Sequence, residues 1–567
     1  MLPPPAVRGI YRTDSRARAA YAEAAGIYRI VPQAVCLPAD IDDLLHLVRW
    51  AAEHRTSLIP RGAGSAMGGG NVGDGVMVDL GHMAGRRLDV DAPARRAVTS
   101  ASVTLAELNA AAGFHGLRLP PDPSSGQWAS LGGMVSTNAA GARSVRYGSI
   151  RSWVEALTIV TAESEVMELR RGKSRPESVA LARFHRDAAP AIASAAPLIA
   201  AKYPHTRKNS SGYALDAYLA SGDVLDLFIG SEGTLGIVTE IEWRLDAQPA
   251  CRAGLRVSLR SLDELSPAVA ALGPAQPSAV ELLDRTFLDL VGSAALSEAH
   301  LHSSDADAVL LVELERDDDE SLTQAVEWAT SAVRPFALSV ETGVLAEAAD
   351  RLWAIRHAAS PLLSRLPEGQ RSLQVIEDGC VPIARMGEYI RAVRRAAVEC
   401  GIPAVMFGHA GDGHVHVNLL PEVTRPGWEA AVTRVMDAVT ETLVRLGGTL
   451  SGEHGDGRLR ADALARVYGP EIVELFRLLK RSFDPLGIFN PGIILPCPEG
   501  PHAGDPPISR LKVGSTAAPL PDDLQRSLRE IERTGGYGRC RLELAGELSQ
   551  ESGVGSRESS GPLDRSL

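Results

Sequence analysis

The sequence has few of the patterns that would place a protein in a membrane, on nucleic acid or around a metal–sulfur cluster. Only six of its 567 residues are cysteine, and no two form a C-x-x-C pair, so neither a zinc ribbon nor an iron–sulfur cluster has its usual ligand spacing. No stretch approaches the roughly 18 uninterrupted apolar residues that a membrane-spanning helix requires. The net charge is -12, and no basic run is dense enough to follow a phosphate backbone. We therefore expect isolated, reduced thiols, no transmembrane segment and no nucleic-acid partner.

The first residues also lack the apolar core of a secretion signal. We therefore expect a cytoplasmic protein, attached at most peripherally to the inner membrane. Hydrophobic residues make up 45% of the chain, which is enough for several buried cores. The length suggests three or four domains of about 150 residues each.

Glycine, in contrast, is abundant, and it gathers in three segments. The first, RGAGSAMGGGNVGDG, begins at Arg61 after a predicted strand. It fits the dinucleotide fingerprint of the Rossmann fold poorly, because Met67 stands at the third glycine position and the following residues are too glycine-rich for a helix. Exposed backbone N–H groups in such a loop can still cradle a pyrophosphate, although a flexible surface loop is the alternative. Two further glycine-rich runs, at 120–160 and 230–245, would let the backbone approach a large cofactor closely.

The pattern of apolar residues divides the chain into a mixed first half, a second domain and a tail. Residues 39–56 carry apolar residues at helical spacing and precede a short strand. A linker-like change of composition near 246–254 separates the halves. The last segment is rich in Pro, Gly, Ser and charge, and we expect it to be largely disordered, with one amphipathic helix candidate at 521–535.

Three histidines lie in the segment GHAGDGHVHVNLL. Its GDG sequence predicts a hairpin turn, so His409 before the turn and His416 after it can face each other, with Cβ atoms about 5 Å apart if the two are directly paired. His414 lies on the same face of the second strand as His416. This arrangement suits two ligands of one metal ion, and an ordinary strand with a polar face is the alternative.

A second motif, LSGEHGDGRLR, contains the adjacent pair Glu453 and His454. In extended backbone the two side chains point in opposite directions and can serve two tasks. A divalent ion held by two histidines needs an anionic third ligand, which Glu453 can supply. The alternative for the pair is a loop that caps a helix.

Together, these segments resemble a known family. The three glycine-rich runs are similar to the flavin domain of the vanillyl-alcohol oxidase type. The second half resembles the C-terminal domain of the FAD enzymes that include glycolate oxidase, D-lactate dehydrogenase and D-2-hydroxyglutarate dehydrogenase. The resemblance implies an α+β fold with an N-terminal segment (1–36), a two-subdomain FAD-binding domain (37–247), an α+β substrate (cap) domain with an antiparallel sheet (248–497) and the tail (498–567).

The resemblance implies that FAD is held mainly by the glycine-rich runs. The residues that match cofactor-binding positions are Pro60, Arg61, Gly62, Ala63, Gly64, Ser65, Pro121, Asp122, Ser124, Gly132, Gly133, Thr137, Asn138, Gly141, Gly236, Ile237, Val238 and Asn490. Some relatives tether FAD covalently through a histidine in the first glycine loop, where this chain has Ser65. We therefore expect non-covalent FAD.

The resemblance also implies roles on the substrate side. His409, His416 and Glu453 match the ligands of a divalent metal, for which zinc is the first choice and manganese or iron are alternatives. His454 matches the acid–base histidine beside the flavin. Arg356 matches an arginine that grips the substrate carboxylate, and a solvent-facing helical arginine is its alternative.

Two positions depart from the family pattern. Residue 414 is usually asparagine, so His414 either adds a fourth nitrogen near the metal or replaces one hydrogen-bonding group with another. Asp456 stands where many single-unit members have isoleucine, and it resembles the branch whose flavin unit is fused to an iron–sulfur unit. Because this chain has no cluster ligands, we expect electrons to leave to a separate acceptor.

The sequence thus predicts an FAD-dependent dehydrogenase that oxidises a D-2-hydroxy acid, such as D-lactate or glycolate, to the 2-oxo acid. Its acceptor would be a quinone, a cytochrome or an iron–sulfur protein. The alternatives are a D-2-hydroxyglutarate-type dehydrogenase, a metal-dependent hydrolase that uses the same histidines, and a flavin-binding protein without catalysis. A homodimer is one candidate assembly.

Overall fold

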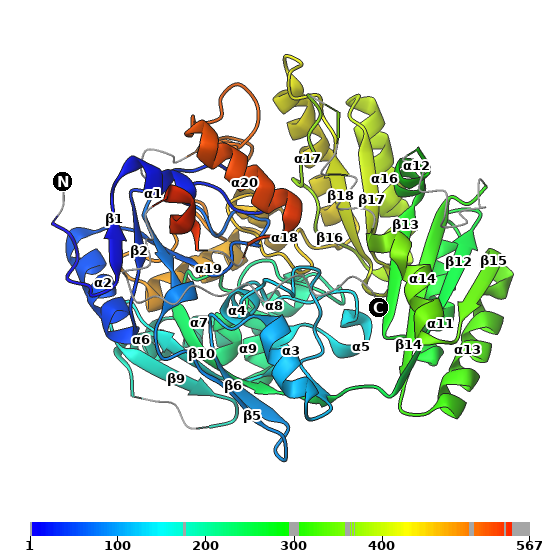
Figure 1. Ribbon diagram of the computed structural model, residues 1–567, viewed down its shortest axis with the longest axis horizontal. Helices are drawn as coiled ribbons and strands as arrows, with labels where there is room; N and C mark the ends of the chain where they lie inside the picture. Colours follow the sequence, from blue (N-terminus) through cyan, green and yellow to red (C-terminus); the bar gives the residue numbers. More distant parts are fainter. Residues whose placement is uncertain are drawn as a thin grey trace.

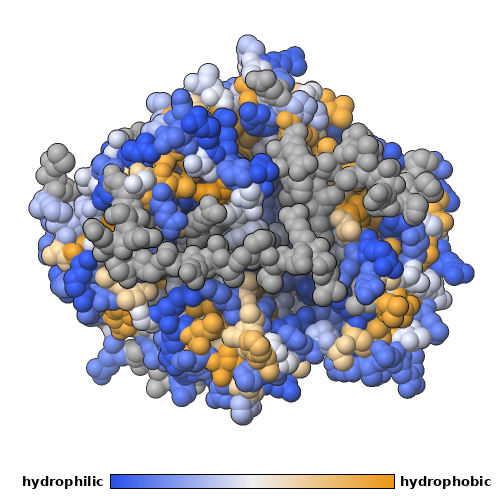
Figure 2. Space-filling model, in the orientation of Figure 1, coloured by the Kyte–Doolittle hydropathy of each residue, from blue (hydrophilic) through white to orange (hydrophobic). Residues whose placement is uncertain are grey.

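The computed structural model describes residues 3–173, 177–293, 305–357, 363, 366–367, 369–497, 504–537 and 540–546. The chain forms two lobes (Figure 1). The first lobe contains the sheets and helices up to residue 247 and also the last helices of the chain. The second lobe contains one large sheet and the helices that cover it, within residues 251–445. Hydrophilic residues dominate the face in Figure 2, and apolar residues occur there in separate patches.

The first lobe begins with a four-stranded sheet in the order β1-β2-β4-β3, in which β4 pairs parallel with both β2 and β3. Its strands are β1 (Ile10–Arg12), β2 (Ala34–Leu37), β3 (Leu58–Arg61) and β4 (Val76–Asp79). Helix α2 (Ile41–His54) covers the sheet, because Leu44, Leu47 and Val48 recur at helical spacing and are buried against it. The glycine loop therefore starts at the carboxyl end of β3.

The second sheet of this lobe is antiparallel, in the order β5-β6-β10-β8-β9. Its strands are β5 (Leu88–Asp91), β6 (Arg96–Ser100), β8 (Val154–Val160), β9 (Val166–Arg170) and β10 (Ile237–Arg244). A short pair is formed by β7 (Leu117–Arg118) and β11 (Asp246–Ala247). The helices are α1 (Ser15–Ala20), α3 (Leu105–Gly113), α4 (Leu131–Thr137), α5 (Ser144–Tyr147), α6 (Val179–Asp187), α7 (Ala189–Ser194), α8 (Ala196–Lys202), α9 (Leu215–Ser221) and α10 (Leu225–Phe228).

The second lobe is built on a seven-stranded sheet, in the order β15-β12-β14-β13-β17-β18-β16, whose pairings are all antiparallel. The strands are β12 (Cys251–Leu259), β13 (Ala279–Asp284), β14 (Ala308–Arg316), β15 (Ala337–Gly343), β16 (Gly379–Cys380), β17 (Ala404–His409) and β18 (His414–Leu419). The helices are α11 (Leu265–Leu272), α12 (Arg285–Ser293), α13 (Asp319–Val333), α14 (Ala346–His357), α16 (Met386–Glu399) and α17 (Trp428–Arg445). Eight of the nine residues of β14 are buried, so both faces of the sheet are covered there. The expected α+β class with an antiparallel sheet is confirmed.

After the second lobe, the chain returns to the first. Helices α18 (Leu464–Tyr468) and α19 (Pro470–Phe483) pack against first-lobe segments, and Phe483 stacks on Phe184 of α6 with ring centroids 5.2 Å apart. Helix α19 therefore lies with the first lobe, although the expected substrate domain runs to residue 497 (Figure 1).

The C-terminal tail was expected to be largely disordered. Residues 504–537 and 540–546 instead have a defined structure and pack on the first lobe. The amphipathic helix candidate corresponds to α20 (Asp522–Thr534), which buries Leu524, Leu528 and Ile531. Residues 498–503, 538–539 and 547–567 lie outside the described residues. Among the helices that the structure describes, none combines the length and apolar character needed to cross a membrane.

Candidate active site

Strands β17 and β18 carry the three histidines to one end of the second lobe's sheet. A 3-10 turn at Ala410–Asp412 connects them, followed by Gly413 with φ +74°. The cross-strand neighbour of His416 is Phe407 rather than His409, because the turn takes up four residues. The direct pairing considered from the sequence is therefore wrong, yet the two histidine rings still converge, with Nε2 atoms 3.2 Å apart.

Hydrogen bonds fix which ring nitrogens carry protons. His409 Nδ1 contacts the Glu281 carboxylate, and His416 Nδ1 lies 3.0 Å from the Glu377 carbonyl oxygen. Because these oxygens accept, each Nδ1 carries the proton and each Nε2 presents a lone pair. Glu453 Oε1 lies 3.2 Å from His409 Nε2 and 3.5 Å from His416 Nε2. Three electron-pair donors thus face one another and require a cation among them.

The spacing of the three donors suits a metal ion. Ligand atoms around a tetrahedral ion with bonds of about 2.1 Å lie about 3.4 Å apart, close to the separations here. A proton is the other cation available to the cluster. Burial alone would lower the pKa of His409, but the Glu281 carboxylate beside it raises this pKa to about 9. The donor set therefore fits either a divalent ion or, without one, a protonated His409.

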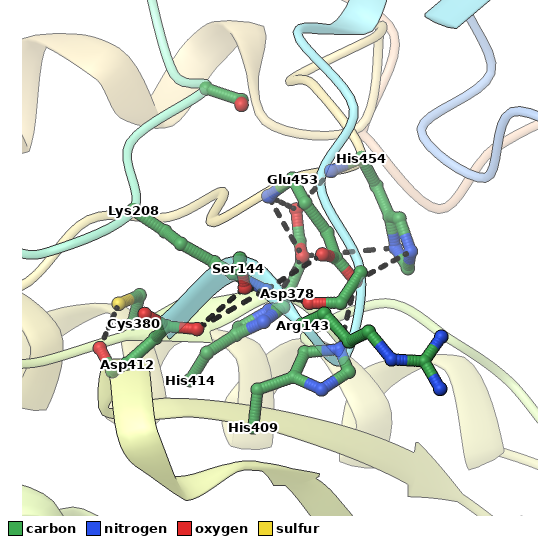
Figure 3. Close-up of polar contacts among 12 residues, drawn as sticks. Arg143, Ser144, Lys208, Asp378, Cys380, His409, Asp412, His414, Glu453 and His454 are labelled. Atoms are coloured by element: carbon green, nitrogen blue, oxygen red, sulfur yellow. Dashed lines mark hydrogen bonds and ion pairs between the residues drawn. The ribbon is translucent and has the colours of Figure 1, made fainter. Parts of the chain in front are cut away.

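Lys208 holds Glu453 from the other side. Its Nζ lies 2.8 Å from Glu453 Oε2 and 3.1 Å from the carbonyl oxygen of Gly141 (Figure 3). Burial would raise the pKa of Glu453, but the ammonium of Lys208 and the ring of His409 hold it well below its usual range. The carboxylate thus stays ionised with one oxygen directed at the histidines. Nothing in the sequence around Lys208 marks it for this contact.

Asp378 organises the loop that carries Glu453 and His454. Its carboxylate is fully buried and accepts hydrogen bonds from the backbone N–H groups of both residues and from the Ser451 hydroxyl. It also accepts from His414 Nε2, at 2.8 Å. His414 Nδ1 is buried and has no hydrogen-bond partner among the described residues. That lone pair is the candidate fourth nitrogen that the sequence leaves open.

His454 lies beside the donor set and is partly open to the cavity. Its Nδ1 is 2.7 Å from Glu377 Oε2, and its Nε2 is 3.7 Å from Glu453 Oε1. Arg460 binds the other oxygen of Glu377. Burial would lower the pKa of His454, but Glu377 and Asp378 raise it to about 10. His454 is therefore held by a carboxylate that favours its protonated form.

Arg356 also reaches this site, from helix α14. Its Nε lies 2.9 Å from Glu281 Oε2, and its guanidinium lies 4.4 Å above the Phe407 ring. Its side chain is only 16% exposed, which rules out the solvent-facing alternative. Glu281 therefore orients both Arg356 and His409.

One cavity of about 1150 Å³ joins this cluster to the glycine loops. It is lined by the expected cofactor residues Pro60, Arg61, Gly62, Ala63, Gly64, Ser65, Asp122, Ser124, Gly132, Gly133, Thr137, Gly141, Gly236, Ile237 and Val238, and by His409, His416, Glu453, His454 and Arg356. Glycine lets the loops pack together, since a Cβ on Gly62 would lie 2.1 Å from Ser130 Oγ and one on Gly132 2.6 Å from Ala101. The walls thus suit a large ligand bound by backbone.

Three expected cofactor residues do not line this cavity. Pro121 is not among the lining residues. Asn138 ends helix α4 in the left-handed conformation, and its side chain turns toward Ser210. Asn490 donates to the carbonyl oxygens of Gly70 and Glu232, both at 2.8 Å, and so fixes the glycine loop from behind. The part that these three residues play in binding FAD therefore stays a prediction.

The chain matches two family models: the FAD binding domain over residues 32–170 and the C-terminal domain of FAD linked oxidases over residues 248–494. It is 31% identical over 466 residues to D-lactate dehydrogenase of Archaeoglobus fulgidus, covering 81% of this chain and 91% of that protein. It is 29% identical to the glycolate oxidase subunit GlcD of Bacillus subtilis, covering 82% and 89%.

D-2-hydroxyglutarate dehydrogenase of Escherichia coli is 26% identical over 543 residues, which is 91% of this chain but 53% of that protein. The chain therefore spans about half the length of that relative. Among solved structures, 4-ethylphenol oxidase from Gulosibacter chungangensis has a similar fold, with a TM-score of 0.60 at 15% identity over 86% of this chain and 94% of the other.

The fold, the glycine-lined cavity and these matches define an FAD-binding oxidoreductase. More narrowly, the chain belongs to the family of FAD-linked oxidases. The resemblance indicated by the sequence motifs is thus confirmed, and the hydrolase alternative loses support because the histidine cluster opens into the FAD cavity.

Proposed function

We propose that the chain is an FAD-dependent dehydrogenase that oxidises a D-2-hydroxy acid to the corresponding 2-oxo acid. The observation that carries this proposal is the convergence of His409, His416 and Glu453 beside His454, within the cavity that the FAD loops also line. The similar proteins are named for D-lactate, glycolate and D-2-hydroxyglutarate, which share the 2-hydroxy acid group.

His409 Nε2, His416 Nε2 and Glu453 Oε1 would hold a divalent ion, with zinc as the first choice. His414 belongs to the same group of candidate ligands, and its Nδ1 has no hydrogen-bond partner among the described residues. FAD, when bound, accepts a hydride from the substrate carbon, and a divalent ion, when bound, lowers the pKa of the substrate hydroxyl. Non-covalent FAD remains part of the proposal, because Ser65 has no nitrogen to form a tether.

The chain's own residues supply the remaining chemistry. His454 takes the hydroxyl proton, and Glu377 fixes its ring through Nδ1 so that Nε2 is the exchanging nitrogen. Arg356, oriented by Glu281 and supported by Phe407, binds the substrate carboxylate. Loss of the proton and the hydride leaves the 2-oxo acid.

D-2-hydroxyglutarate is the second candidate substrate. The Escherichia coli enzyme of that name aligns with 91% of this chain, compared with 81% for the Archaeoglobus fulgidus D-lactate dehydrogenase. For either substrate we propose a separate electron acceptor, which is a quinone, a cytochrome or an iron–sulfur protein. The cytoplasmic location and the homodimer remain predictions from the sequence.

Anaerobic mixing with matched D- and L-2-hydroxy acids, followed by flavin absorbance, tests the proposed activity. The D enantiomer of one acid should bleach the flavin and the L enantiomer should not. The panel includes D-lactate, glycolate and D-2-hydroxyglutarate. A loaded flavin that no member of the panel reduces would refute the proposal.

Two neighbouring substitutions test the assigned roles. Glu453→Gln should lose bound metal while FAD content stays unchanged. His454→Asn should keep both metal and FAD, yet slow flavin reduction by about 10²–10⁴, the usual effect of removing a positioned base. If His454→Asn lost its metal, or reduced flavin at the wild-type rate, this division of roles would be wrong.

A further inference from the structure

The C-terminal tail lines the FAD cavity, although it lies beyond residue 494, where the matches to the family models end. Glu532, Arg533, Thr534, Gly535 and Tyr537 line the same cavity as the glycine loop. These residues form the end of α20 and the turn after it, and Figure 1 shows α20 lying across the first lobe.

The described part of the tail contacts the first lobe at several points. Its residues 510–512 run antiparallel to residues 27–29, with Arg29 N–H donating to the Arg510 carbonyl and Lys512 N–H to that of Ile27, both at 2.9 Å. Lys512 Nζ in turn lies 2.7 Å from Glu532 Oε1, and Arg16 pairs with Asp523 at 2.6 Å. The end of α20 is thus held at the cavity by contacts at both ends of the helix.

The turn after α20 packs tightly on a cavity residue. Gly535 has φ +74°, and a Cβ there would lie 2.3 Å from the Trp128 ring. Trp128 lines the cavity together with Tyr537. The tail therefore adds the Tyr537 ring to a wall that already contains the Trp128 ring. A planar base stacks on aromatic rings of this kind.

Positive charge gathers behind the same wall. Arg61 and Arg541 are 2% and 3% exposed. Nε and Nη1 of Arg541 have no hydrogen-bond partner in the described part of the chain, and its guanidinium lies 5.9 Å from the Tyr537 ring. Burial, and next the charge of Arg61, lower the pKa of Arg541 to about 10. Arg61 and Arg541 are thus two buried cations, and Asp79 is the carboxylate that acts on Arg541. Because burying unpaired charge is costly, the pair favours an added anion.

We propose that Glu532, Arg533, Thr534, Gly535 and Tyr537, with Arg541 buried behind them, form a wall of the FAD site against the adenosine diphosphate half of the cofactor and slow its release. The pyrophosphate supplies the anion that the two arginines favour, and adenine supplies the planar group. The flavin half is assigned to the other end of the cavity, where His454 lies.

FAD release tests this proposal directly. The rate of FAD loss, followed by the rise of flavin fluorescence after dilution, should be about tenfold faster in Arg541→Met and in Tyr537→Ala. Arg529→Met is the matched control, because Arg529 lies on the exposed face of α20, and its release rate should equal that of wild type. Arg541→Lys keeps the charge and should recover part of the retention.

A measurement on the unaltered protein covers the case in which a variant misfolds. Hydrogen exchange of wild type with and without FAD should show slower exchange in peptides that cover residues 528–537 when FAD is bound. Unchanged exchange in these peptides, or release from Arg541→Met and Tyr537→Ala as slow as from Arg529→Met, would overturn the proposal.

Discussion

Lys208 is the residue whose removal should most cleanly separate metal binding from FAD binding. It neutralises the oxygen of Glu453 that faces away from the histidines and keeps the carboxylate in place. Lys208→Met should therefore weaken metal binding by about 10–100-fold, the usual effect of losing such a supporting contact, while FAD retention stays at the wild-type level. Competition with a chelator measures the metal affinity.

Lys202→Met is the control for this change, because Lys202 is exposed on α8 in the same region of the sequence. Lys208→Arg should retain part of the affinity. Equal metal affinity in Lys208→Met and Lys202→Met would show that Lys208 has no part in the site.

The contact between Glu377 and His454 should set the pH dependence of flavin reduction. Glu377 raises the pKa of His454, and a base must be unprotonated to act, so the rate rises as pH increases through that pKa. Glu377→Gln removes the negative charge beside His454 and so lowers the pKa of that histidine. The pH range over which the rate of flavin reduction rises should therefore move to lower pH. Stopped-flow reduction across pH measures this shift. A range that stays in place, or moves to higher pH, would contradict the assignment of His454 as the base.

At the scale of elements, the turn between β17 and β18 should be intolerant of any side chain at Gly413. Gly413 has φ +74°, a Cβ there would lie 2.0 Å from the Val381 carbonyl oxygen, and Val381 N–H donates to the Gly413 carbonyl at 2.9 Å. Gly413→Ala should lower the free energy of unfolding by about 3 kcal/mol, because backbone strain and a collision act together. Metal affinity should fall as well, because the turn sets the histidine separation.

Gly427→Ala provides the comparison, because Gly427 has φ +81° with open space around its Cβ position. It should cost about 1 kcal/mol, the backbone strain alone. Urea unfolding of both variants measures the difference, and equal losses would show that the Val381 contact is unimportant.

Elements that depend on residues close together in the sequence could be predicted. Features that depend on contacts between residues far apart in the sequence could not. The helical spacing at 39–56 corresponds to α2 (Ile41–His54), and the GDG sequence does mark a turn. The register across that turn could not be predicted, because it depends on how many residues the turn takes up. The tail was expected to be disordered from its composition, but tertiary contacts such as Gly535 with Trp128 hold it.

The candidate site shows the same limit. Motif and resemblance brought His409, His416, Glu453 and His454 to attention, and the structure places them together. Lys208 lies in no motif, and its action on Glu453 from far away in the sequence could not be predicted. The hold of Asp378 on the Glu453 loop could not be predicted either, because it too depends on a distant contact. Asn490 holds the glycine loop from outside the cavity, and its expected part in binding FAD stays a prediction.

At the scale of the whole molecule, FAD should be held only by the shape and charge of the cavity. Acid precipitation, which unfolds the chain, should therefore release all flavin into the supernatant as FAD. Absorbance of the supernatant and of the redissolved pellet measures the distribution. Yellow colour that stays with the washed pellet would show a covalent link.

The return of the chain to the first lobe has a consequence for biosynthesis. The aromatic core of the first lobe unites Phe184 and Phe228 with Phe483, whose ring centroids lie 5.2 and 4.9 Å from theirs. During translation, the first lobe must therefore wait for α19, which leaves the ribosome only after the second lobe has been made, whereas the sheet of the second lobe is continuous in sequence. We expect the order of folding to reverse the order of synthesis, so that ribosome-bound chains stopped near residue 485, with α19 still inside the ribosomal exit tunnel, resist protease in the second lobe and are cleaved in the first. Equal protection of both lobes in such chains would disprove this order.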